Sequence, residues 1–174
     1  MTATYDCIAT TTLGSAQSSF TFSSISGSFT DLRIIIQARS TAAGNGRESF
    51  RIRLNGDTGS NYSATYILGN GSAASSSRSS SQTYALAMFQ ESNSSSTKYG
   101  MNTLDIMNYS NTTTYKTGLT RSSYNLLGST EDSSAAHVFL WRSTSAITSI
   151  EFSTDASGGL SSGSTFTLYG IKAE

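Results

Sequence analysis

The sequence predicts an all-β fold: an antiparallel β-sandwich, jelly-roll-like, with about ten short strands. Three observations support this prediction. Short apolar clusters recur with a period of two, no useful window shows the period of an α-helix, and turn-forming residues separate the clusters. Ser and Thr supply roughly a third of the chain, which suits solvent-facing sheet positions and turns.

Two segments show the strand pattern most clearly. Leu32–Ala38 is the most apolar and is expected near the centre of a sheet, and between Phe50 and Asn55 apolar and polar residues alternate, as in a strand with one buried face. Tyr115–Arg121 is a weaker candidate. In chain order, the expected strands are Ile8–Leu13, Phe20–Ile25, Leu32–Ala38, Phe50–Leu54, Tyr62–Leu68, Thr83–Phe89, Tyr99–Tyr109, Tyr115–Arg121, Val138–Trp141, Ile147–Phe152 and Phe166–Ile171.

The connections contain residues that tolerate positive φ angles, such as Asn55-Gly56 and Asn70-Gly71. Ser72–Ser81 is almost entirely Ser and Ala around Arg78, and we expect a loop there that is mobile or orders on assembly, as for Ser92–Thr97. A division into two domains at these segments would leave each half with too few strands to close well. Residues 1–174 are therefore expected to form a single jelly-roll domain.

The charge balance argues against general nucleic-acid binding, because 11 basic and 11 acidic residues give a net charge of zero. The chain has one cysteine, Cys7, and so no internal disulfide. It contains no apolar stretch near the roughly 20 residues of a membrane span and nothing resembling a secretory signal. We therefore expect synthesis in a cytoplasm and no membrane partner.

Two segments resemble catalytic motifs, and both have a simpler interpretation. Asp57-Thr58-Gly59 matches the aspartic-protease signature, but Asn55-Gly56 places it in a turn and no second copy occurs. His137, the only histidine, precedes an apolar run and is expected to be structural. The sequence therefore predicts no enzyme, no catalytic residues and no cofactor. A calcium ion bound by oxygens at Asp57 or Asp132 stays open.

Two further groups suggest contacts with a partner. Five of the eight arginines lie close together in the sequence, and on two neighbouring strands they would form a guanidinium patch; the alternative is a solvated sheet face. They are Arg33, Arg39, Arg47, Arg51 and Arg53. Five aromatic residues would suit a sugar-stacking platform, although the core or a subunit contact is the favoured interpretation. They are Tyr84, Tyr99, Tyr109, Phe139 and Trp141.

Three segments carry a resemblance to a known family: IATTTLGSAQSSFTFSSISGSFTDLRIII, RIRLNGDTGSNYSATYILGNGS, and LWRSTSAITSIEF together with the closing GSTFTLYGIKA. They resemble small jelly-roll virion proteins of tailed, cyanophage-like bacteriophages, of the capsid cement or decoration type. The resemblance implies a homotrimer on the outer surface of the phage head that binds the major capsid protein and stabilises neighbouring subunits. The alternative is a tail-fibre or receptor-binding tip that recognises host polysaccharide.

Overall fold

Twelve strands and no helix make up the described part of the chain, residues 4–42, 47–91, 99–125, 132–154 and 158–172 of a computed structural model. The predicted all-β sandwich is confirmed: each of the eleven expected strands has a counterpart, and β6 is an additional strand. The strands are β1 (Tyr5–Thr12), β2 (Ser19–Phe22), β3 (Asp31–Ala38), β4 (Arg47–Leu54), β5 (Tyr62–Gly69), β6 (Ala74–Gln82), β7 (Ala85–Glu91), β8 (Gly100–Ile106), β9 (Lys116–Asn125), β10 (Asp132–Trp141), β11 (Ile150–Thr154) and β12 (Thr165–Ile171).

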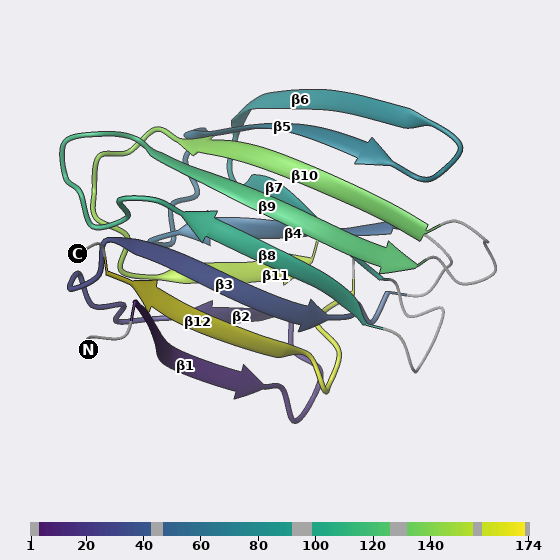
Figure 1. The fold of residues 1–174 in the computed structure, drawn as a ribbon, viewed down its shortest axis with the longest axis horizontal. Helices are drawn as coiled ribbons and strands as arrows, with labels where there is room; N and C mark the ends of the chain where they lie inside the picture. The colour runs from purple at the N-terminus through teal and green to yellow at the C-terminus, as the bar shows by residue number, and fades with distance from the viewer. Residues whose placement is uncertain (1–3, 43–46, 92–98, 126–131, 155–157, 173–174) are drawn as a thin grey trace.

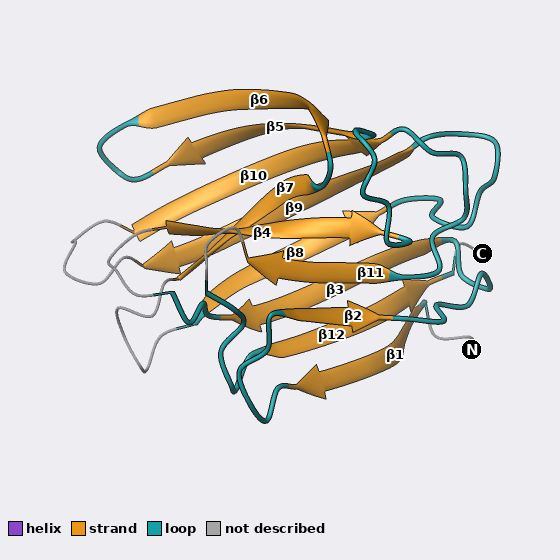
Figure 2. Ribbon diagram, turned by 180° about the vertical axis from the view of Figure 1, so that it is seen from behind, coloured by secondary structure: helices purple, strands orange, loops and turns teal. Residues whose placement is uncertain are grey.

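The strands form two stacked antiparallel sheets. The larger has eight strands in the order β1-β12-β3-β8-β9-β10-β5-β6, and it faces the viewer in Figure 1. The smaller has the order β2-β11-β4-β7 and faces the viewer in Figure 2. Each named pair of neighbours is antiparallel, so each sheet can bury one face and leave the other in contact with solvent.

Eight of the strands have jelly-roll connectivity. Taken in chain order, consecutive strands of these eight lie in opposite sheets, except β4 and β7, which are neighbours in the small sheet. This places β1-β12-β3-β8 over β2-β11-β4-β7, two four-stranded sheets of a jelly roll. The hairpins β5–β6 and β9–β10 are insertions. Both add to the large sheet beyond β8, and we call these four strands the extension.

The core lies between the two sheets. Strand β3 buries Leu32, Ile34 and Ile36, and the facing strand β4 buries Phe50 and Ile52, because alternate side chains of each strand point inward. Ring contacts join the layers: Phe152 and Phe166 have centroids 5.6 Å apart, and Phe50 and Phe166 meet edge to face at 6.5 Å. Each fully buried side chain of this size contributes roughly 1.5–3 kcal/mol.

The expected loop at Ser72–Ser81 was wrong, because most of this segment belongs to strand β6. Strand β6 pairs with β5 through the backbone, from Gly69 opposite Ala74 to Tyr62 opposite Gln82. It is the edge strand, and the small sheet ends at β7, so solvent reaches both of its faces. A strand with both faces in solvent needs no apolar side chains, so a tract of serine can form it. The expectation for Ser92–Thr97 lies outside the described residues.

Candidate interaction surface

The five clustered arginines do not form one patch. Strands β3 and β4 belong to opposite sheets, so Arg33 lies on one outer face of the sandwich while Arg51 and Arg53 lie on the other. Arg39 follows β3 and packs over the ring of Tyr99 at 5.2 Å. Arg47 begins β4, and its side chain is outside the described part of the structure. A role of these residues in binding a partner stays a prediction.

Arg33 instead takes part in an ion-pair network on the outer face of the large sheet. Its Nε donates to Oδ1 of Asp105 at 2.5 Å, and Arg121 donates through Nη2 to Oδ2 of the same carboxylate at 3.1 Å. Arg33 also donates to the hydroxyl of Tyr5. The hydrogen bond with Asp105 raises the pKa of Arg33, so the arginine stays charged. Only 8% of the Asp105 side chain is exposed beneath these two guanidinium groups.

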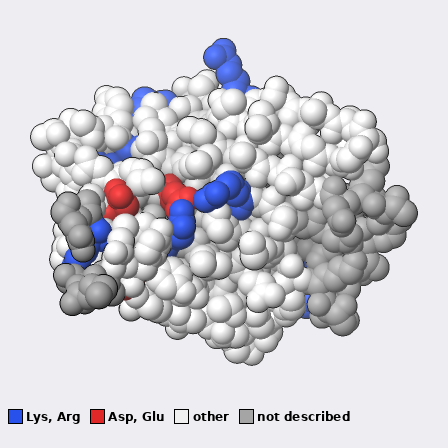
Figure 3. Space-filling model, in the orientation of Figure 1, with Lys and Arg blue, Asp and Glu red and all other residues white. Residues whose placement is uncertain are grey.

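The rest of this outer face carries few charges and several exposed apolar side chains. Of the eight large hydrophobic side chains that are exposed among the described residues, six lie at outward positions of the large sheet. Figure 3 shows this face as mostly uncharged atoms around a compact group of basic and acidic ones. The six are Tyr5, Ile35, Ile67, Met101, Leu119 and Val138. Exposed hydrophobic side chains gathered on one face make that face the candidate interaction surface.

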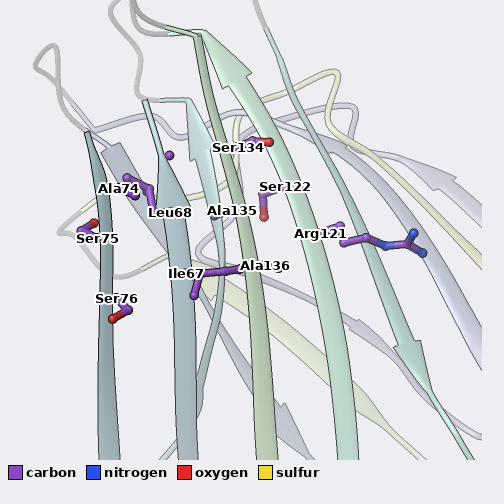
Figure 4. Close-up of a pocket in the computed structure, with 11 residues that line it drawn as sticks. Ile67, Leu68, Ala74, Ser75, Ser76, Arg121, Ser122, Ser134, Ala135 and Ala136 are labelled. Carbon is purple, nitrogen blue, oxygen red and sulfur yellow. The ribbon is translucent and has the colours of Figure 1, made fainter. Parts of the chain in front are cut away.

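Two shallow depressions lie on the extension. The larger, about 690 Å³, is lined by residues of β5, β6, β9 and β10, among which Ile67, Ala136 and Arg121 point outward (Figure 4). The second, about 350 Å³, lies further along the same strands and includes Arg78 and Val138. Small side chains such as Ala136 create the hollow beside bulkier neighbours. The charged side chains that line them are arginines: Arg121 in the larger depression, and Arg78 and Arg142 in the smaller one.

Asp57 lies in the turn after β4, as the sequence predicts, and its carboxylate is occupied structurally. Oδ2 accepts hydrogen bonds from Nε1 of Trp141 at 2.7 Å and Nδ2 of Asn61 at 2.9 Å, and Oδ1 accepts one from the amide of Gly59 at 2.7 Å. Burial acts to raise the pKa of Asp57, but these three donors outweigh it and lower the pKa. The group joins the β4–β5 turn to the end of β10 and is no shared-proton dyad.

His137 is structural as well. It is fully buried on the inner face of β10, its Nδ1 contacts the carbonyl of Leu86 at 3.2 Å, and its ring stacks on Tyr66 at 5.1 Å. Burial lowers the pKa of His137 to about 4, so the ring is neutral at physiological pH. A buried neutral imidazole of this kind connects the two sheets.

The five aromatic residues do not form a platform. Tyr109, Phe139 and Trp141 are buried in the core, as favoured from the sequence. Tyr84 lies against Arg51, whose guanidinium carbon is 4.6 Å from the ring centroid, and Tyr99 lies against Arg39.

Metal and membrane sites find no support in the described residues. These residues contain no group of three or more His, Cys, Asp or Glu side chains placed to hold a metal ion. The side chain of Asp132 lies outside them. In the same part of the chain, no helix is long and apolar enough to span a membrane.

Neither protein-family models, nor curated proteins, nor solved structures match this sequence.

The sequence analysis did not identify three prominent residues of this region as contacts: Ile67, Val138 and Arg121. Alternation within β10 carries a signal, since Phe139 is buried and its neighbour Val138 is 51% exposed. An apolar residue at the solvent-facing position of an alternating strand marks a candidate contact. The signal can be used only when it is known which side chains of the strand face the core. Here that knowledge comes from the arrangement of the two sheets.

Proposed function

We propose that this protein is a structural, non-enzymatic component of a large protein assembly. In its specific form the proposal is a capsid cement protein, a homotrimer on the outer surface of a tailed-phage head that binds the major capsid protein. The sequence resemblance supplies the phage context. The fold is compatible with it, because jelly rolls serve in viral capsids as well as in lectins.

One observation carries the proposal: six exposed hydrophobic residues share the outer face of the large sheet, where few charges interrupt them. A flat face of this kind offers area for protein contact rather than an enclosed site for chemistry. The groups that resembled catalytic residues, Asp57 and His137, are engaged in holding turns and sheets together. A surface protein of a shell gains from such a face because symmetry repeats each contact many times.

The test compares phage particles assembled with and without this protein. We expect particles that lack it to lose resistance to heat and to osmotic shock, and to regain it when the purified full chain is added. Particles that stay equally resistant would contradict a cement role. The copy number per virion separates the two phage locations, since hundreds of copies indicate the head and a few to dozens indicate the tail. Saturable binding to host polysaccharide on a glycan array would favour the tail-fibre alternative.

A further inference from the structure

We propose that the outer face of the extension is the surface that binds the shell, and that the shell presents an acidic area to it. The extension face comprises the outward residues of β9, β10, β5 and β6, together with Arg142 directly after β10. This inference rests on the proposed function and adds to it the contact surface and the chemistry of the partner. It is separate from the predicted role of Arg33, Arg39, Arg47, Arg51 and Arg53 in binding a partner, which stays a prediction.

The extension is cationic although the chain as a whole is neutral. Its four strands contain one acidic residue, Asp132 at the start of β10, whose side chain is outside the described part. Arg78 is exposed in the middle of β6 and makes no ion pair within the described residues. Arg142 donates only to neutral oxygens, those of Ser60, Tyr62 and Ser63. Among the described side chains of this face, the positive charge is compensated by a carboxylate where Arg121 reaches Asp105.

Apolar side chains lie among these arginines. Val138 of β10 is directly opposite Leu119 of β9, and the two are 51% and 40% exposed. Ile67, 63% exposed, is opposite Ala136 on the other side of β10. An apolar centre with arginine around it has the composition of a protein interface, where arginine is enriched and lysine depleted. The extension's lysine, Lys116, is buried and donates to the carbonyls of Thr114 and Thr144.

Carboxylates of a partner would complement the positive charge of this face. A planar guanidinium group binds a carboxylate through two parallel hydrogen bonds, and the exposed Arg78 is available for such a pair. A second copy offering the same face would set arginine against arginine, and like charges across an interface cost affinity. Contacts between copies in a homotrimer would then use other surfaces and leave the extension face to the shell.

The test measures binding of the purified full chain to capsids assembled without it, at low and at high salt, about 0.05 M and 0.5 M NaCl. Two variants alter the face: Arg78→Glu reverses the charge of β6, and Val138→Asp places a charge in the apolar centre. The matched control is Thr21→Glu, at an exposed position of β2 on the opposite sheet. Each variant is first checked for a native circular dichroism spectrum and thermal transition.

We expect wild-type binding to weaken at high salt, and each face variant to bind at least about tenfold less tightly than the wild type. Thr21→Glu should stay within about twofold. Binding that does not depend on salt would contradict the proposal that the partner is acidic. Unchanged binding by both face variants would contradict the proposal that the extension face is the contact surface. Face variants that turn an oligomer into monomers, seen by light scattering, would show that a second copy occupies the face. Wild-type protein that binds no capsid would refute the cement role itself, a result distinct from all of these.

Discussion

Acidification from neutral pH towards pH 4 should destabilise the protein through one buried side chain, His137. The imidazole is fully buried and neutral, and charging it inside the sandwich is costly. In the unfolded chain the same group has its ordinary pKa near 6.5, whereas burial lowers the folded-state pKa to about 4. The unfolded state therefore binds a proton over a range of pH in which the folded state does not.

The sign and the size of the effect follow from this difference. Above pH 6.5 the imidazole is neutral in both states and does not affect folding. As the pH falls from 6.5 to about 4, only the unfolded state takes up the proton, so the free energy of unfolding decreases. Since each tenfold difference in proton affinity corresponds to about 1.4 kcal/mol, the full loss is about 3 kcal/mol, complete below pH 4.

Urea denaturation at a series of pH values measures this loss, and the single tryptophan, Trp141, is a buried fluorescent reporter of unfolding. His137→Asn removes the titrating group while keeping a donor for the carbonyl of Leu86. The variant should be less stable at neutral pH, yet its stability should vary less with pH between 6.5 and 4. Asp57, whose pKa is lowered, contributes an acid-linked loss common to both proteins. Parallel pH profiles for the wild type and the variant would refute the reasoning.

Three further substitutions test a buried hydrogen bond and the packing of the core. Trp141→Phe removes the 2.7 Å hydrogen bond from Nε1 to the carboxylate of Asp57, and should lower the free energy of unfolding by about 1.5–3 kcal/mol in urea denaturation followed by circular dichroism. Gly118→Ala would place a Cβ 2.4 Å from the ring of Phe139 and should cost about 1–3 kcal/mol, whereas Gly69→Ala, with nothing within 4 Å, should change stability by less than about 1 kcal/mol. Equal effects of the two glycine substitutions on the thermal midpoint would contradict the close packing of Phe139.

Much of the fold was predictable because the jelly-roll strands carry the alternating pattern of a half-buried sheet. In β3 and β4 the inward residues are Leu, Ile and Phe, and the outward ones are mostly polar. Strand β6 was missed for the opposite reason. At the sheet edge both of its faces meet solvent, so the backbone pairing with β5 leaves no trace in the side chains.

The placement of the arginines was not predictable from local pattern. Arg33 and Arg53 lie on consecutive strands, and in a simple meander such strands would be neighbours. In this connectivity the chain crosses to the other sheet between β3 and β4, so the two residues end on opposite faces. Arg121, distant in sequence, becomes the neighbour of Arg33 because both reach Asp105. Sequence identifies which residues face out, but only the strand order decides which of them meet.

The two inserted hairpins also set an order of events during synthesis. Strand β5 pairs with β10, where Tyr62 lies opposite Trp141, so the β5–β6 hairpin leaves the ribosome long before its sheet neighbour exists. An isolated hairpin is marginally stable in water, and an apolar one would invite aggregation while it waits. The serine tract of β6 resists such association, because aggregating segments combine hydrophobicity with β-propensity. The serine content that made β6 resemble a loop should therefore reduce association of the hairpin with other chains before β10 is synthesised.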